Sequence, residues 1–320
     1  MRVAVIGGGR NDEHVVSLAS AAGVSYAVQL LGWESVALTI DDAGAWRDRH
    51  GATLSAARAI ALMSECDVAY PALHGVHGED GAVAGLLDLC SIPYVGSPVR
   101  AGAIGMDKWL TKLVAAALGI RTAAGVLLTP DAPAAVAMPL PVVVKPASGG
   151  SSNGVSVVTD SAQLPDAIAH ARQSGETVLV EEYVRGREVD IAVFRDATGR
   201  LRLGSTLEIG VEDGGVFGRD AKYDGTARFT LPAEISSAED AAIRAVASSL
   251  YEAMGCSGVA RFDFFVTDTG PVLNEVNTSP GMTEQSQVPR MFAAVGVEYP
   301  QLIAELVAAA HVTEPIGIPA

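Results

Sequence analysis

The sequence feature that most constrains the fold is a predicted β-hairpin near the C-terminus. Apolar runs over Gly258–Val266 and Pro271–Val276 flank a Thr-Asp-Thr-Gly turn at residues 267–270, which is typical of two adjacent antiparallel strands. Val272 and Leu273 lead into the second strand and a loop sequence follows it, as expected of an internal strand. Charged and amide side chains interrupt both runs, so the hairpin places polar groups inside a sheet.

Four polar side chains of this hairpin are expected to converge. Residues two apart in a strand share a face, so Arg261 and Asp263 point the same way from the first strand. Glu275 and Asn277 do so from the second, and the turn sets the two pairs opposite each other. Two carboxylates and an amide oxygen suit Mg²⁺, and a neighbouring arginine suits an oxyanion or a carboxylate. The competing interpretation is a solvated polar face with cross-strand ion pairs, which an internal strand disfavours.

The N-terminal third alternates predicted strands with predicted helices. This order predicts a parallel sheet with helices on both faces. The glycines Gly7–Gly9 lack the GxGxxG spacing of a dinucleotide-binding turn. The expected elements are strands at Val3–Ile6, Ser35–Ile40, Asp67–Pro71 and Pro93–Val95, and helices at Glu13–Leu31, Ala57–Ser64 and Gly81–Leu89.

The pattern changes after about residue 97. Residues 97–180 have the pattern of an antiparallel sheet with helices on one side. The polar, glycine-rich segment Gly210–Gly225 has the composition of a lid. We therefore expect three units, 1–96, 97–180 and 181–320. The expected elements of the last two are helices at Met106–Leu118, Leu164–Gln173, Ala238–Met254 and Tyr299–Ala310, and strands at Leu140–Lys145, Val155–Val158, Val178–Val184, Val189–Phe194 and Leu201–Ile209.

A second polar motif joins two of these strands. Ser148–Gly154 is rich in glycine and serine, and Lys145 closes the apolar strand before it. A Walker loop would instead lead into a helix that begins with Lys-Ser or Lys-Thr, so this motif is a different one. Small residues let backbone N–H groups and serine hydroxyls cover a phosphate. An ordinary flexible hairpin explains the same composition equally well.

Composition excludes several classes of protein. An apolar content of 49% with only 18% charged residues is incompatible with a disordered chain. The net charge of -15 argues against a nucleic-acid partner, although a local cluster of lysines still allows phosphate binding. Three separated cysteines form no disulfide pattern, and no apolar run is long enough to span a membrane. We therefore expect a cytoplasmic protein without a membrane partner.

Other polar residues are ambiguous when taken alone. Lys108 and Lys222 are explained as surface lysines at least as well as by phosphate binding. Glu181 and Glu182 end a predicted strand, and Glu188 follows a few residues later. Carboxylates at strand ends bind amines or ribose hydroxyls in some proteins and are only solvated in others.

Two sites in the N-terminal third are also open to more than one interpretation. Glu13 begins a helix, whose N-terminus stabilises a carboxylate without any ligand, and it is also suited to a substrate ammonium. His74 and His77 have HxxH spacing, but no cluster of Cys or further His completes a zinc site. A substrate contact is the better hypothesis for this pair.

Taken together, these motifs resemble the D-alanine–D-alanine ligases of the ATP-grasp superfamily over nearly the whole chain. Their order and spacing are difficult to obtain by chance. The stretches that carry the resemblance are Leu73-His74-Gly75, Gly78-Glu79-Asp80-Gly81, Met106-Asp107-Lys108, Val144-Lys145-Pro146, Gly150–Gly154, Ala221-Lys222-Tyr223, Arg261-Phe262-Asp263 and Asn274–Thr283.

The resemblance implies an ATP-grasp fold of three α/β domains, with ATP between the central and C-terminal ones, and a role for each matching residue. ATP would contact Lys108, Lys145, Ser151, Ser152, Glu181, Glu182, Val184, Glu188, Lys222 and Asn274. Two Mg²⁺ ions, or Mn²⁺, would be held by Asp263, Glu275 and Asn277. The catalytic set would be Glu13, Ser151, Lys222, Tyr223 and Arg261, and the amino-acid substrates would contact Glu13, His74, Gly281 and Ser286.

The implied activity is the ATP-dependent joining of two D-alanines through an acyl phosphate, for peptidoglycan synthesis. Glu13 would hold the first ammonium and form a hydrogen-bonded triad with Ser151 and Tyr223. Arg261 and the backbone N–H of Gly281 would stabilise the tetrahedral oxyanion. The resemblance also implies a homodimer formed through the N-terminal region.

Three positions depart from the family pattern. Val15 stands where a glutamate is common, and Ala84 where a glutamine is common. Gln287 follows Ser286, the expected ligand of the second carboxylate, where a leucine or methionine usually packs against the second D-alanine. Gln287 motivates an alternative, a D-amino-acid or dipeptide ligase with a different second substrate that serves antibiotic synthesis or self-resistance.

Overall fold

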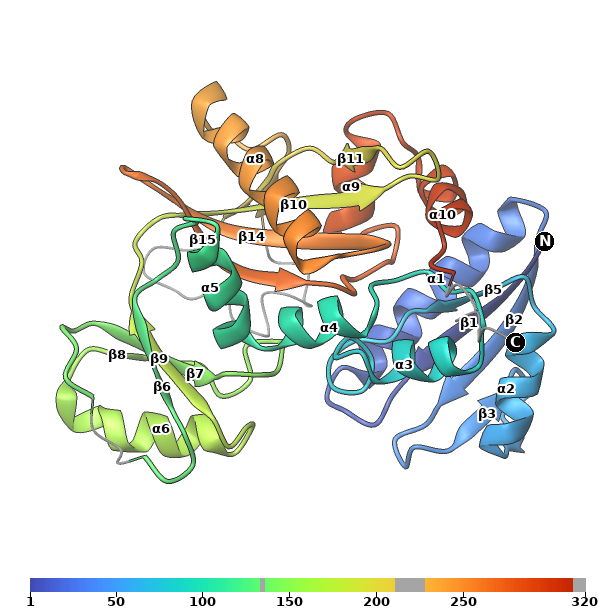
Figure 1. Ribbon diagram of the computed structural model, residues 1–320, viewed down its shortest axis with the longest axis horizontal. Coiled ribbons are helices and arrows are strands. Elements are labelled where there is room, and N and C mark those ends of the chain that lie inside the picture. The colour runs from blue at the N-terminus through green and yellow to red at the C-terminus, as the bar shows by residue number, and fades with distance from the viewer. Residues whose placement is uncertain (133–135, 211–227, 313–320) are drawn as a thin grey trace, which may run out of the picture.

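The structure, a computed structural model, describes residues 1–132, 136–210 and 228–312. These residues form three sheets with helices packed against them (Figure 1). None of the helices in these ranges has the length and apolarity needed to cross a membrane. The architecture agrees with the mixed α/β, ATP-grasp fold expected from the sequence. The unit boundaries at residues 96 and 180 stay predictions.

The N-terminal sheet has the strand order β4-β3-β2-β1-β5. Its parallel core is confirmed, because β1 (Arg2–Gly8) pairs in parallel with β2 (Glu34–Ile40) and β5 (Val68–Pro71). The sequence pattern missed β3 (Trp46–Asp48) and β4 (Thr53–Leu54), which are very short and extend the sheet in antiparallel fashion. The sheet is therefore mixed rather than purely parallel.

Helices cover both faces of this sheet, as predicted. Val3 and Val5 of β1 belong to the same apolar cluster as the buried side chains of α1 (His14–Leu30). The alternate residues Ala4 and Ile6 pack instead with α2 (Ala56–Ser64) and α3 (Ala82–Leu89). A strand with two buried faces is expected in the middle of a parallel sheet.

The predicted strand at Pro93–Val95 is wrong. Only Tyr94 pairs there, through isolated bridges to Ala69 and to His311. Pro93 has no N–H to donate, so a regular ladder does not extend through this segment. The predicted helix Met106–Leu118 is confirmed as α5 (Lys108–Ala117), whereas the sequence pattern missed α4 (Val99–Met106), which precedes it.

Asp107 separates α4 from α5. Its backbone is extended, and its side chain accepts hydrogen bonds from the N–H groups of Trp109 and Leu110 at 2.8 and 3.0 Å. Such a cap satisfies N–H groups that the first turn of a helix leaves without partners. Lys108 is therefore the first residue of α5, at the end of the helix that meets the central sheet.

The central sheet is antiparallel, as predicted, with the order β6-β9-β7-β8. Its helix α6 (Leu164–Arg172) contributes Ile168 and Ala171 to one apolar cluster with β7 and β9. Figure 1 places α6 on the side of this sheet that faces away from the third sheet. The strands are β6 (Gly125–Leu128), β7 (Val142–Pro146), β8 (Ser156–Val158) and β9 (Val178–Glu182).

The third sheet has the order β13-β12-β10-β14-β15, and β11 pairs with β10. The predicted hairpin is confirmed as β14 (Val259–Thr267) and β15 (Gly270–Asn277). The predicted strand Leu201–Ile209 is corrected, because it divides into β11 (Leu201–Leu203) and β12 (Leu207–Gly210). The remaining elements are β10 (Arg187–Arg195), β13 (Arg228–Thr230), α8 (Ser237–Met254), α9 (Gln287–Ala293) and α10 (Tyr299–Ala308).

The C-terminal helices join the first and third sheets. Leu302 and Leu306 of α10 lie in one apolar cluster with Val24 of α1 and with Phe194 of β10. In Figure 1, α10 lies beside α1, at the junction of the two units. This packing fixes the loop that follows β15 against the loop that follows β5, and the candidate site begins there.

Candidate functional site

The hairpin brings its polar side chains together as predicted. Asp263 lies directly opposite Glu275 in the β14–β15 ladder, and Arg261 lies opposite Asn277. The Arg261 guanidinium donates to both oxygens of the Asp263 carboxylate, with both distances 2.7 Å. The Asn277 amide nitrogen donates to the same carboxylate at 3.0 Å. Asp263 is 2% exposed, so these contacts compensate a buried charge.

A further carboxylate extends this row, and sequence reasoning missed it. Asp190 of β10 lies opposite Asp263 in the neighbouring ladder, and its carboxylate is 3.5 Å from the Arg261 guanidinium. Burial alone would lower the pKa of Arg261, but the surrounding carboxylates outweigh it and raise that pKa. The available signal was an aspartate in the middle of the apolar run Val189–Phe194.

A bulge in β15 brings two consecutive side chains to one face. The register shifts between Asp263 and Phe264, so Asn274 and Glu275 both stand opposite Asp263. Both line a cavity of about 730 Å³ between the central and third sheets. A cavity of this size suits a small-molecule cofactor or substrate.

The cavity gathers most of the residues that the sequence assigned to ATP. The structure brings together Lys108, Lys145, Ser151, Ser152, Glu181, Glu182, Val184, Glu188 and Asn274 along its walls. The predicted residues Lys222 and Tyr223, and the predicted lid beyond Gly210, lie outside the described residues. Asp263 and Asn277 stand behind Glu275 rather than in the cavity lining.

Lys108 connects the glycine-rich loop to the hairpin. Its ammonium donates to the Gly149 carbonyl at 2.7 Å and lies 3.6 Å from the Glu275 carboxylate. Ser151 and Ser152 adopt left-handed backbone conformations with φ of 53° and 58°. Such conformations are uncommon for residues other than glycine and are found mainly in tight turns. The loop therefore turns sharply over the mouth of the cavity.

Glu181 is buried between two lysines. Its carboxylate contacts the ammonium of Lys145 through one oxygen and lies 2.8 Å from Lys112 Nζ through the other. Burial alone would raise the pKa of Glu181, but the two lysines outweigh it, so the net effect lowers that pKa. Sequence reasoning identified Lys145 and Glu181 and missed Lys112, which looks like an ordinary helix lysine.

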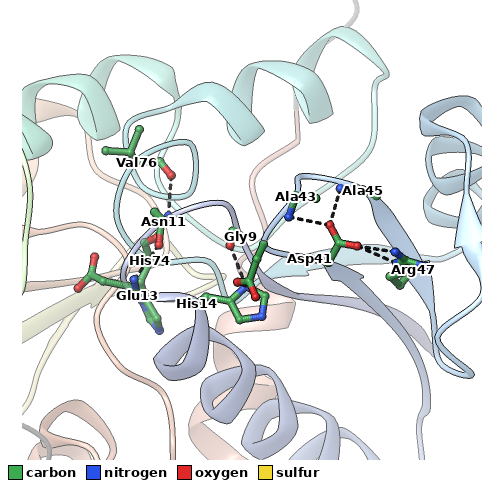
Figure 2. Close-up of polar contacts among 11 residues, drawn as sticks. Gly9, Asn11, Glu13, His14, Asp41, Ala43, Ala45, Arg47, His74 and Val76 are labelled. Carbon is green, nitrogen blue, oxygen red and sulfur yellow. Dashed lines mark hydrogen bonds and ion pairs between the residues drawn. The ribbon is translucent and has the colours of Figure 1, made fainter.

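Glu13 lies between two glycine-containing loops. Ser151 Oγ donates to Glu13 Oε1 at 2.6 Å. A Cβ atom on Gly75 would come within 2.5 Å of the Glu13 carboxylate, and one on Gly150 within 3.2 Å. Only residues without side chains allow both loops to approach so closely. Figure 2 shows Glu13 beside Asn11 and His74, near the N-terminus of α1.

His74 is buried and neutral, and it links the N-terminal unit to the segment after β15. Its Nδ1 donates to the Ser279 carbonyl at 2.7 Å, which leaves Nε2 as the acceptor of a 2.9 Å hydrogen bond from Ser20 Oγ. Burial lowers the pKa of His74. The Asn11 amide donates to the His74 carbonyl at 2.8 Å (Figure 2). His74, an expected substrate contact, therefore also connects the loop after β5 to the segment after β15.

Gly281 and Ser286 lie close together after the hairpin. Ser286 precedes α9, and its Oγ accepts a hydrogen bond from the Thr283 N–H at 3.1 Å. A Cβ atom on Gly281 would lie 3.2 Å from Ser286 Oγ. Gln287 is the first residue of α9. The structure thus places all three at one turn, in the segment that contacts His74 and Ser20.

No group of three His, Cys, Asp or Glu side chains in the described ranges is arranged to hold a metal ion. The predicted ligand set differs from such a group because its third member, Asn277, is an amide. The HxxH pair gains no further support, because the His74 ring is occupied by Ser279 and Ser20.

Comparisons with known proteins give consistent results. Family models described as D-ala D-ala ligase N-terminus and D-ala D-ala ligase C-terminus match residues 2–97 and 130–308. The D-alanine–D-alanine ligase of Rhodococcus opacus is 38% identical, covering 96% of this chain and 95% of the relative. That of Mycolicibacterium smegmatis is 40% identical, with 96% and 94% covered.

Solved structures have the same fold over nearly the whole chain. The VanG D-Ala:D-Ser ligase from Enterococcus faecalis superposes with a TM-score of 0.81 at 29% identity, covering 96% of this chain and 98% of that chain. The D-alanine-D-alanine ligase from Coxiella burnetii gives a TM-score of 0.82 at 27% identity, covering 97% and 93%.

Proposed function

The chain belongs to the D-alanine–D-alanine ligase family, and on that premise we propose which residues perform each part of the reaction. The enzyme joins two D-alanines in an ATP-dependent reaction that forms an acyl phosphate and serves peptidoglycan synthesis. A carboxylate is a poor electrophile because its leaving group would be oxide, whereas an acyl phosphate loses a stable phosphate. The observation that carries the residue assignments is the cavity that gathers Lys108 and Lys145 beside the Asp263–Glu275 pair.

ATP occupies this cavity in our proposal. Its volume and its lysines support this assignment, since phosphoryl transfer depends mainly on positioning and charge neutralisation. Lys108, Lys145 and Lys222 contact the phosphates, and Ser151 and Ser152 lie in the loop that covers them. Glu181, Glu182 and the Val184 backbone contact adenine, Glu188 contacts the ribose, and Asn274 completes the site.

Asp263, Glu275 and Asn277 hold two Mg²⁺ ions in this proposal, and Mn²⁺ is a substitute. Their hard oxygen donors fit Mg²⁺, and the cross-strand pairing of the two carboxylates places them together. Mg²⁺ supplies charge neutralisation for the triphosphate when bound. Arg261 already holds both oxygens of Asp263, so the guanidinium keeps that carboxylate oriented.

The first D-alanine binds through its ammonium to Glu13. Ser151, which donates to Glu13, supports this arrangement, and Tyr223 is the third member of the triad. His74 lies nearby. The tetrahedral oxyanion is stabilised by Arg261 and by the Gly281 N–H. Water must be kept from the acyl phosphate, and closure of the Gly210–Gly225 lid is proposed to do so.

Ser286 binds the carboxylate of the second amino acid, and Gln287 stands beside it. The curated relatives named above are D-alanine–D-alanine ligases, so they do not favour the alternative second substrate. A panel of second amino acids, with each product identified by mass, tests this directly. A clear preference for an amino acid other than D-alanine would support the alternative.

The experiment that tests the activity is phosphate release with ATP, Mg²⁺ and D-alanine. We expect release that depends on all three, with D-alanyl-D-alanine identified as the product. Absence of release at any D-alanine concentration would contradict the proposal. Use of ATP as substrate also supports a cytoplasmic location.

A homodimer through the N-terminal region is supported by an apolar stripe on α1. Val15, Leu18, Tyr26 and Leu30 recur at helical spacing and are 75%, 37%, 58% and 57% exposed. We expect light scattering to give the mass of two chains. The Tyr26→Glu variant should shift the protein towards the monomer without unfolding it, and an unchanged mass would contradict this interface.

A further inference from the structure

Lys112 stands beside the proposed ATP site without an assigned task. The chain has only four lysines among its 22 lysines and arginines, so arginine is its usual basic residue. Lys108, Lys145 and Lys222 belong to the motifs assigned to ATP, and Lys112 is the fourth. A chain that uses arginine elsewhere has lysine at these positions, which indicates that Lys112 also has a specific role.

Lys112 lies directly behind the cavity wall. Lys108 and Lys112 are one turn apart in α5 and therefore share a face. Lys112 Nζ donates to the Ala123 carbonyl at 2.7 Å and lies 2.8 Å from Glu181 Oε2. The other oxygen of Glu181 pairs with Lys145. Lys145, Glu181 and Ala123 line the cavity and Lys112 does not, so Lys112 acts on the nucleotide site through these neighbours.

The three charges are all buried. The exposed fractions of the three side chains are 9% for Lys112, 8% for Lys145 and 6% for Glu181. With one carboxylate between two ammonium groups, neither lysine can take both oxygens of Glu181. Without Lys112, the carboxylate would close onto Lys145 and occupy donors that face the cavity.

We propose that Lys112 is a positioning residue that holds one oxygen of Glu181, so that Glu181 and Lys145 keep the orientation required to bind ATP. This inference rests on the proposed function of those two residues. It also explains why this residue is a lysine: the compact ammonium group donates a hydrogen bond to the Ala123 carbonyl and at the same time forms an ion pair with Glu181 Oε2. An arginine would bring five donors in a planar fork into the same buried space.

The first test is Lys112→Met, which removes the charge and keeps a similar length. We expect the KM for ATP and the ATP dissociation constant to rise about tenfold, the effect of losing one charge-assisted contact. The kcat at saturating ATP and the KM for D-alanine should stay within about twofold. Leu113→Ala, at a half-exposed neighbour in α5, is the matched control and should change none of these values. Loss of kcat with unchanged ATP binding would overturn the proposal.

A thermal-stability comparison tests the pairing independently. Glu181→Gln leaves two buried ammonium groups facing a neutral amide, whereas adding Lys112→Met leaves only one. The double variant should therefore melt at a higher temperature than Glu181→Gln alone. A lower melting temperature would overturn the role of Lys112 and leave the ATP site itself intact. Failure of the wild-type protein to bind ATP would instead overturn the proposed function together with this inference.

Discussion

Two parts of the site are built in opposite ways. The hairpin row consists of Arg261, Asp263, Glu275 and Asn277, and the Glu13 junction consists of Glu13, His74 and Ser279. Asp263 and Glu275 stand on adjacent strands joined by one turn, where Asp263 is paired with the buried Arg261 and Glu275 with Lys108. Glu13, His74 and Ser279 come from segments far apart in the chain, which hydrogen bonds to a serine hydroxyl and to backbone groups connect. The comparison teaches that substitutions in the row should stop the chemistry, whereas substitutions at the junction should change binding and stability.

Glu275→Gln should have the largest effect and test the chemical role of the row. Glu275 is proposed to hold Mg²⁺, whose stabilisation of transition-state charge is worth several kcal/mol, so removing this carboxylate should lower kcat by about a thousandfold or more. Phosphate release measures the effect, and calorimetry checks the fold. The exposed Glu284→Gln is the matched control. A melting temperature that falls in proportion to activity would identify Glu275 as structural.

Arg261→Lys should have the next largest effect. Lysine keeps the charge beside Asp263 and Asp190 but loses the fork that holds both oxygens of Asp263. We expect kcat to fall about a hundredfold, as for loss of one oxyanion donor, with ATP affinity nearly unchanged. Arg261→Ala is a poorer test because it leaves two buried carboxylates without their cation, which destabilises the fold. A defect mainly in ATP binding would contradict the oxyanion role.

Glu13→Gln tests the junction without disturbing its geometry. The amide oxygen can still accept the Ser151 hydrogen bond, so the variant removes only the negative charge. We expect the KM for D-alanine to rise about thirtyfold, the effect of losing a hydrogen bond to a charged group. Initial rates at saturating ATP measure this, with Asp12→Asn as the exposed neighbouring control. An unchanged KM for D-alanine would place the ammonium elsewhere.

Glu79→Gln should give the smallest effect and appear only as a change in pH dependence. Burial, together with Glu13, raises the pKa of Glu79 to about 7, while N–H groups of Gly75 and Ser279 hold its carboxylate. The folded protein therefore keeps a proton that the unfolded chain loses between about pH 4.5 and 7. The free energy of unfolding should fall as pH rises through this range, by at most about 1.4 kcal/mol per pH unit.

The amide that replaces the Glu79 carboxyl group does not titrate, so the variant should flatten this part of the profile. Melting temperatures between about pH 4.5 and 8 measure the difference. An identical slope in both proteins would show that Glu79 does not carry this pH dependence.

The hairpin was predictable because the residues that determine it are close together in the sequence. Alternating strand positions and a turn determine that Asp263 faces Glu275, and the ladder confirms it. Helix α4 was missed because its eight residues include Gly102 and Gly105, and glycine disfavours a helix. Lys112 and Asp190 were missed because their partners, Glu181 and Arg261, lie on other elements that are distant in the sequence. The roles of the site residues themselves stay predictions until the variants are measured.

The bulge at Asn274 has a consequence for how this strand evolves. Leu273 pairs with Phe264 in the core, and Glu275, only two residues later, pairs with Asp263 on the opposite face. In an unbroken ladder, Leu273 and Glu275 would face the same side, and one of them would be misplaced. The extra residue shifts the alternation by one position, so that the side chains after it point to the opposite faces of the sheet. Deleting it would exchange the inside and outside of everything beyond it, so insertions and deletions at this point should be far less tolerated than substitutions.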